Sequence, residues 1–138
     1  MGLVGETPEF AEFASSNGRT LRVYSDSLET IQPLENLTQA GDRLQQLKRA
    51  IVQAVPGGVK WMGQDLEQGL LDAPNSPAYI WYSESALSWR GFGTYATNGE
   101  RTAIITLGVG RNESLGSNPQ LIDDMLAMLT DVVRSVEF

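Results

Sequence analysis

The chain has 138 residues, with 17 acidic and 10 basic side chains and a formal net charge of −7. It contains no cysteine and no histidine, so disulfides, thiolate metal sites and catalysis by histidine are excluded. The negative charge disfavours nucleic acid and anionic membranes as partners, because their phosphates would be repelled. No apolar run approaches the roughly 20 residues of a membrane span. We expect one domain over residues 1–138, either cytoplasmic or exported after removal of a signal.

The first 25 residues predict one short helix and one strand. Thr7 and Pro8 are typical of a helix start and Asn17-Gly18 of a helix end, so we expect a helix over residues 7–18. The stretch RTLRVYS, residues 19–25, alternates apolar and polar side chains and predicts a strand.

Residues 33–55 predict a long amphipathic helix, because apolar side chains recur at steps of three and four. Pro33 suits its first turn, and the following Pro-Gly-Gly ends it. The helix carries three basic residues, Arg43, Lys48 and Arg49. We interpret them as its solvated side, with a site for an anion or an acidic partner as the alternative.

The segment after this helix predicts short elements. The stretch VKWMG, residues 59–63, reads as a short strand. The stretch DLEQGLLDA, residues 65–73, reads as one or two helical turns. Three longer strands follow, over residues 79–84, 87–97 and 101–109.

A tight hairpin joins the last two predicted strands. Asn98-Gly99 is a strong signal for a two-residue type I′ turn, in which both residues have positive φ. That turn would place Phe92 opposite Ile105.

The same register gathers three glycines on one face of the hairpin. Gly91 and Gly93 lie at alternating positions between Trp89 and Tyr95, and Gly108 of the other strand lies opposite Trp89. Glycine inside a strand costs stability, so a cluster indicates close approach of another group. Two interpretations stay open. Either a helix packs on the glycines or the sheet bends there, or they form the floor of a shallow groove for an apolar ligand or a partner's side chain.

The stretch GVGRNESLGSNP, residues 108–119, resembles a phosphate-binding loop only superficially. Its first glycines precede the next helix by about ten residues, the preceding strands are antiparallel, and Glu113 adds a negative charge. We therefore interpret it as a long polar connection, and expect Arg111 and Glu113 to contact a partner if the loop has a function.

The last element is an amphipathic helix over residues 120–136, with Asn118 as its cap and Pro119 in its first turn. Asp123 and Asp124 lie opposite its apolar side. Neighbouring residues of a helix point about 100° apart, so these two carboxylates do not converge on one site.

From residue 33 to residue 138, the order of elements and four stretches resemble the PsbP-like family. The stretches are VPGGVKW, AYIWYSE, RTAIITLGV and VVRSVEF. The family includes an extrinsic protein of photosystem II, an import factor that binds a Ran-type GTPase, and bacterial lipoproteins. The resemblance implies an αβα sandwich that binds or scaffolds proteins and has no catalytic machinery.

The predicted fold is α+β: an antiparallel meander packed by two long amphipathic helices as an αβα sandwich. We predict a non-enzymatic accessory or protein-interaction module without a cofactor or a metal. A small apolar-ligand carrier and an acidic chaperone or immunity-type inhibitor of a basic protein are the alternatives. The candidate binding residues are Trp89, Gly91, Gly93, Tyr95, Arg111 and Glu113.

Overall fold

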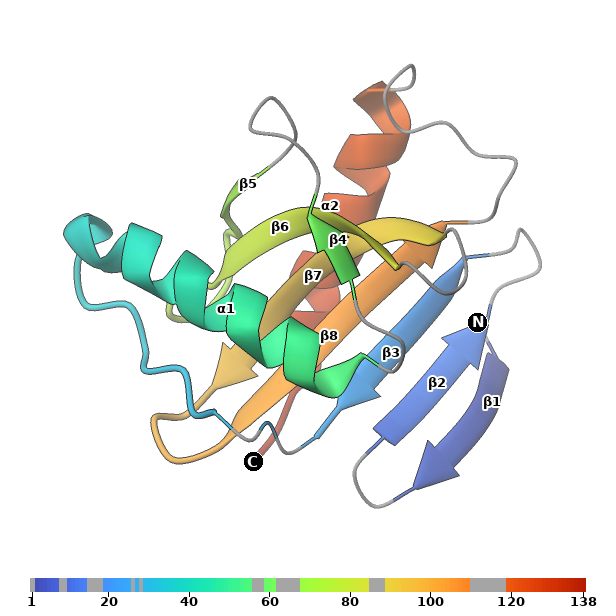
Figure 1. The fold of residues 1–138 in the computed structure, drawn as a ribbon, viewed down its shortest axis with the longest axis horizontal. Coiled ribbons are helices and arrows are strands. Elements are labelled where there is room, and N and C mark those ends of the chain that lie inside the picture. Colours follow the sequence, from blue (N-terminus) through green and yellow to red (C-terminus); the bar gives the residue numbers. More distant parts are fainter. Residues whose placement is uncertain are drawn as a thin grey trace.

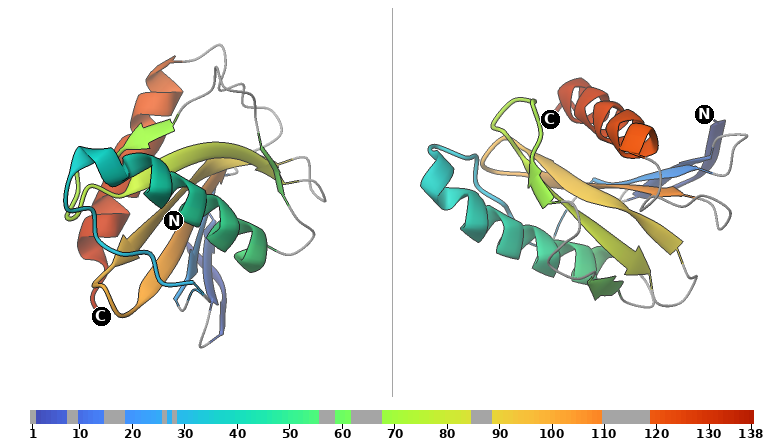
Figure 2. Two further views of the ribbon diagram at one scale, coloured as in Figure 1. Left: turned by 60° about the vertical axis from the view of Figure 1, so that its left-hand side comes forward. Right: turned by 90° about the horizontal axis from the view of Figure 1, so that it is seen from above.

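The structure is a computed structural model. It describes residues 2–7, 10–14, 19–25, 27, 29–55, 59–61, 68–84, 89–109 and 119–138. One antiparallel sheet of eight strands forms its centre, and a helix lies against each face of that sheet (Figures 1 and 2). No helix in these ranges is both long enough and apolar enough to cross a bilayer.

The sheet has the order β1-β2-β3-β8-β7-β6-β4, with β5 also paired to β6. The strands are β1 (Gly2–Thr7), β2 (Phe10–Ala14), β3 (Thr20–Tyr24), β4 (Val59–Trp61), β5 (Gln68–Leu70), β6 (Ala78–Glu84), β7 (Trp89–Thr97) and β8 (Thr102–Val109). The helices are a short 3-10 turn, η1 (Leu37–Gln39), and two α-helices, α1 (Ala40–Ala54) and α2 (Pro119–Ser135). β4 and β5 pair with different halves of β6 along the same side.

The N-terminal segment differs most from its prediction. The helix expected over residues 7–18 is wrong. β2 lies in this range and forms a hairpin with β1, and it also pairs with β3, where Phe13 lies opposite Leu21. Strand β3 itself confirms the prediction for residues 19–25. The helical signals are local. Pairing of β2 with β3, and of β3 with β8, outweighs them because it satisfies the backbone hydrogen bonds of several strands together.

The helix predicted from Pro33 begins only at Ala40. The Asn36 side chain accepts a hydrogen bond from the Thr38 amide at 3.1 Å and starts the 3-10 turn that leads into α1. The helical turns expected over residues 65–73 are also wrong, because residues 68–70 form β5 and pair with β6.

The predicted fold class therefore needs correction. A meander enclosed by two long helices does not form: α1 has 15 residues rather than the 23 of the expected range 33–55, and the sheet is much wider than three strands. α1 packs on β6, β7 and β8, and α2 packs on β7 and β8. The β1–β2 hairpin extends the sheet beyond the area that the helices cover (Figure 1).

Each face of the sheet has its own apolar core. Under α2, Met125 and Leu129 pack with Phe92 and Leu107, all fully buried. The core under α1 joins fully buried residues of the helix, Leu47 and Ile51, to Tyr95 and Ile104 of the sheet. β7 thus sends alternate side chains into two different cores, as the period of a strand requires.

The β7–β8 hairpin has the predicted faces but not the predicted register. Thr97 pairs with Thr102, so the loop has four residues, and Phe92 lies opposite Leu107. Gly99 has φ +89°, whereas Asn98 is not among the described residues with positive φ. The Asn98 side chain instead accepts hydrogen bonds from the amides of Glu100 and Arg101, at 2.9 and 2.7 Å, which holds the wider loop. A shift of two residues leaves every side chain on its predicted face.

Candidate interaction surface

The glycine-lined face of β7 lies toward α1. A Cβ atom added at Gly93 would be 2.5 Å from Cδ1 of Ile51, so this helix occupies the space above the glycine. At Gly91 the added atom would collide with the backbone oxygen of Leu107, beside the paired glycine, Gly108. Close packing of α1 and close approach of β8 therefore account for these two glycines.

Tyr95 is fully buried in the core under α1. Burial raises the pKa of its hydroxyl. The backbone of Ala78 and the positive charge of Arg43 lower this pKa, but by less than burial raises it. Its hydroxyl oxygen has no hydrogen-bond partner of normal geometry. Tyr95 is therefore a neutral core residue at physiological pH.

The structure describes only part of the other predicted binding residues. Trp89 begins β7 and pairs with Glu84, and its side chain lies outside the described part of the structure. Arg111 and Glu113 also lie outside the described residues. Among the six candidates, the described geometry places Gly91, Gly93 and Tyr95 together on one face of β7. Binding at that face and at the loop stays a prediction.

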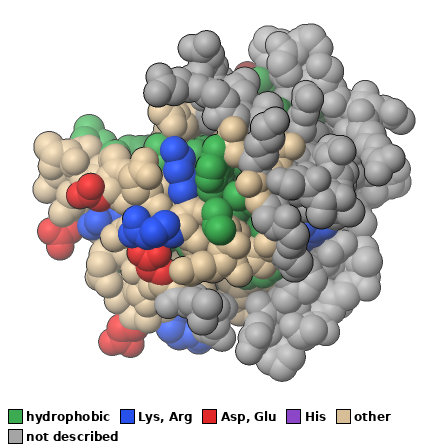
Figure 3. Space-filling view, viewed as in Figure 1, with side chains coloured by type: hydrophobic (Ala, Val, Ile, Leu, Met, Phe, Trp, Pro, Cys, Tyr) green, Lys and Arg blue, Asp and Glu red, His purple; other side chains and the backbone are tan. Residues whose placement is uncertain are grey.

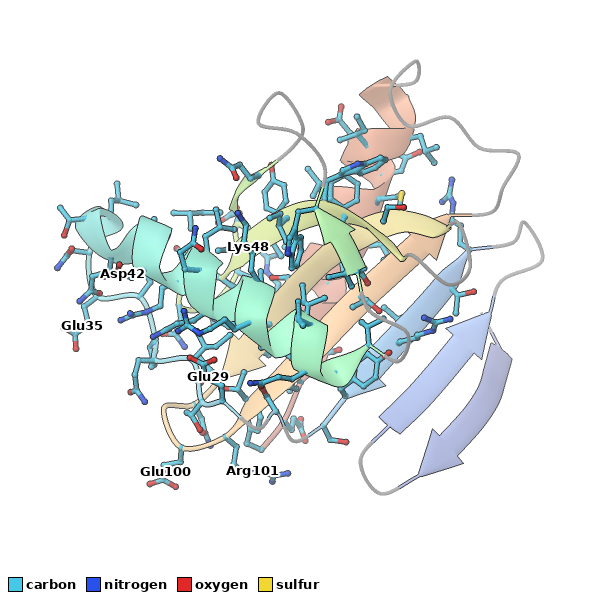
Figure 4. All side chains as sticks on the ribbon, viewed as in Figure 1. Glu29, Glu35, Asp42, Lys48, Glu100 and Arg101 are labelled. Atoms are coloured by element: carbon cyan, nitrogen blue, oxygen red, sulfur yellow. The ribbon has the colours of Figure 1, made fainter. Side chains whose placement is uncertain are left out.

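A different group of residues meets at the outer side of α1. The Lys48 ammonium lies 6.0 Å from the centre of the Trp61 ring, which comes from β4 at the edge of the sheet. The Trp61 ring in turn meets Tyr82 of β6 edge-on, with ring centres 6.0 Å apart. Figure 4 shows Lys48 reaching from α1 toward β4. A cation over an aromatic face is a favourable arrangement that also fixes both side chains.

Apolar side chains are accessible beside this cation. Val52 follows Lys48 by one helical turn, on the same side of α1, and is 49% exposed. Trp61 is partly exposed, as is Val59. Figure 3 shows hydrophobic side chains at the surface between α1 and β4, with basic side chains next to them. We call the set Lys48, Val52, Val59 and Trp61 the α1–β4 surface.

The basic side chains of α1 differ in how they are paired. Arg49 forms two hydrogen bonds with the Glu29 carboxylate, at 2.7 and 3.2 Å, and this carboxylate raises the arginine pKa. Arg43 donates to the backbone oxygen of Pro33 at 3.3 Å. No carboxylate of the described residues forms an ion pair with Lys48. Within the described part of the chain, no carboxylate therefore neutralises the charge of Lys48 on the α1–β4 surface.

The outer side of α2 has the opposite charge. Asp123, Asp124 and Asp131 are exposed, as predicted for the side opposite the apolar stripe. Asp124 accepts a hydrogen bond from Gln120 at 2.9 Å, one turn earlier. In the ranges that the structure describes, no three acidic side chains come together as metal ligands.

The sequence contained only part of the signal for the α1–β4 surface. Lys48 was one of three basic residues interpreted as the solvated side of the helix. Val52 and Trp61 were not singled out, because their proximity depends on β4 pairing at the edge of the sheet. The short strand predicted at residues 59–63 was the one pointer to this position.

Comparison of the chain with models of protein families, with curated proteins and with solved structures found no match. The likeness to the PsbP-like family stays a prediction from the sequence.

Proposed function

We propose that this protein is a non-enzymatic interaction module that binds a protein partner through the α1–β4 surface. The observation that carries the proposal is the accessible group of Val52 and Trp61 beside Lys48, which has no acidic partner among the described residues. Contiguous exposed apolar side chains with polar groups at their rim are typical of protein interfaces. Tryptophan is also among the residues that contribute most to binding energy at such interfaces.

A second candidate function is binding of a basic protein by α2. The exposed aspartates of its outer side support this alternative, together with the net charge of −7. Electrostatic attraction would speed the encounter with a basic partner and would weaken as salt is added.

The third candidate, a carrier of small apolar ligands on the glycine-lined face, has less support. Ile51 occupies the space above Gly93, and Tyr95 is fully buried. We therefore favour a protein partner at the outer side of α1.

The proposal is tested by quantitative capture of partners with matched variants. The binding variant is Val52→Glu, which places a charge among the apolar side chains. The control is Gln45→Glu, an exposed position on the same helix that adds the same charge. Proteins from the native source are cross-linked to each variant and quantified by mass spectrometry. We expect at least one partner to be enriched by the wild type and by Gln45→Glu, and to be lost from Val52→Glu.

Equal capture by both variants, or no specific capture by the wild type, contradicts the proposal. A partner lost at high salt and insensitive to Val52→Glu would instead favour the acidic side of α2. Thermal melting of both variants checks that folding is preserved.

A further inference from the structure

We infer that the α1–β4 surface binds an extended peptide segment that carries both carboxylates and aliphatic side chains, and that this segment pairs with the outer side of β4. The inference deepens the proposed function and rests on it. Three features of the surface carry it: the edge of β4, the apolar side chains beside that edge, and the charge of Lys48.

β4 is the last strand in the order of the sheet and pairs with β6 on one side. No described strand pairs with its other side. In an antiparallel strand, successive residues direct their N–H and C=O groups to opposite sides, so Val59–Trp61 has backbone groups directed away from β6. Peptides in extended conformation bind such edges by adding one more strand. The backbone of β4 therefore favours an extended partner over a helical one.

The side chains next to this edge determine which side chains of the added strand are favoured. Val52 and the partly exposed ring of Trp61 provide apolar surface on the α1 side of β4. An added strand directs every second side chain to that side. Aliphatic side chains at those positions would cover Val52 and Trp61 and remove their apolar surface from water.

The charge of Lys48 selects a carboxylate. α1 carries three basic and one acidic residue, although the whole chain is acidic. Arg49 is already paired with Glu29, and Lys48 has no acidic partner among the described residues. At physiological ionic strength, charges more than about 8 Å away are largely screened. Lys48 therefore determines the local preference at this surface more than the net charge of the protein does.

The experiment uses fluorescently labelled synthetic peptides and the full chain. One peptide repeats the unit Glu-Ser-Val-Ser, which places glutamate and valine on the same face of a strand. A second peptide carries lysine in place of glutamate, and a third carries serine in place of valine. We call them the glutamate–valine, lysine–valine and glutamate–serine peptides. Fluorescence anisotropy measures the dissociation constant of each peptide in low-salt buffer. We expect the glutamate–valine peptide to bind about tenfold more tightly than either of the others. N-methylation of every second residue removes the hydrogen bonds of one edge of the added strand, so two peptides carry it on alternate sets of residues. The peptide methylated on the residues that face β4 should bind more weakly by a similar factor.

Charge reversal gives the matched test. Lys48→Glu should weaken the glutamate–valine peptide about tenfold and strengthen the lysine–valine peptide, since a favourable charge pair becomes a repulsion. Arg134→Glu changes the net charge equally on the other helix, and should leave the preference for the glutamate–valine peptide unchanged. Thermal melting checks that both variants are folded.

Three results would overturn the inference: equal binding of the three peptides, equal effects of the two charge reversals, or full binding by both N-methylated peptides. Each is distinguishable from failure of the proposed function. If Val52→Glu abolishes capture of the native partner and Lys48→Glu does not, the surface is the interface and its partner is not acidic.

Discussion

The two helices of this protein both pack on β7 and β8 but differ in what they meet there and in what they present to solvent. α1 lies over the face of β7 that carries Gly91 and Gly93, whereas α2 lies over Phe92. Outside, α1 carries three basic residues and one acidic residue, and α2 carries three acidic residues and one basic residue. Both inner sides bury apolar side chains in a core, whereas the outer sides carry opposite net charge.

This comparison explains why the glycines of β7 lie on one face only. Under α2, an aromatic group fills the space between helix and sheet: Phe92 meets Trp81 edge-on, with ring centres 5.1 Å apart. Under α1, the helix supplies the volume itself, through Ile51 above Gly93. A strand can therefore carry glycine where a side chain from a facing helix extends down to the backbone of the strand.

The largest expected effect tests whether both helices belong equally to the core. Leu47→Ala in α1 and Leu129→Ala in α2 each remove a fully buried side chain. We expect each to lower the free energy of unfolding by about 2–5 kcal/mol, through lost burial and a residual cavity. Urea unfolding measures both, with the exposed Gln45→Ala as control. A loss at only one helix would show that the other is dispensable for folding.

The glycine face should respond differently at its two positions. Gly91→Ala places a methyl group against the backbone of β8, which cannot move away, and should cost about 3 kcal/mol. Gly93→Ala meets side chains rather than backbone, most closely the terminal methyl of Ile51 and then the Tyr82 ring, and should cost less. Ile51→Val removes that methyl, so the double variant with Gly93→Ala should be more stable than the sum of the two single changes predicts. If the free-energy changes of the two single variants simply add in urea unfolding, Ile51 is not the reason why residue 93 is a glycine.

Tyr95 gives a smaller, pH-dependent effect in the core under α1. Its pKa is raised in the folded protein from 10.0, so the folded state holds this proton more strongly than the unfolded state does. The resulting stability is complete below about pH 10 and is lost as the pH rises above that value. Tyr95→Phe should change stability by less than about 1 kcal/mol at neutral pH, because the hydroxyl makes no normal hydrogen bond.

The same substitution should make alkaline destabilisation less steep, which unfolding curves measured from pH 8 to about pH 11 would reveal. The wild type is the reference at each pH. An unchanged slope would mean that other groups determine the alkaline limit.

The smallest expected effect concerns the outer side of α2. Asp131→Asn changes an exposed carboxylate and should alter the free energy of unfolding by less than about 0.5 kcal/mol. Thermal melting at low and high salt measures it. A larger change would mean that the aspartates stabilise the fold, and would weaken their interpretation as a surface available to a basic partner.

Much of the central sheet could be predicted from the sequence, because its signals are local. β7, β8 and α2 follow from alternation, helical periodicity and the Asn-Gly pair. The error in register has a specific cause, the two hydrogen bonds that the Asn98 side chain accepts. Local signals failed where strand pairing outweighs them: the helix expected over residues 7–18 contains β2 instead, and the helical turns expected over residues 65–73 contain β5.

The candidate site was harder to predict, because it depends on contacts between separate elements. Lys48 and Trp61 belong to different elements, and their contact exists only because β4 pairs with β6 beside α1. Single residues of the glycine face were visible in the sequence, but the helix that covers Gly93 was not assigned to that side.

The pairing of β3 with β8 has a consequence for how the chain folds. Leu21 lies directly opposite Leu107, so the N-terminal strands attach to the rest of the sheet through a contact between residues far apart in sequence. As the chain leaves the ribosome, the side of β3 that pairs with β8 has no native partner until β8 has emerged. Contacts between residues so far apart in sequence form slowly, because the long chain segment between them must be ordered first. During that interval the free side of β3 needs protection from other chains.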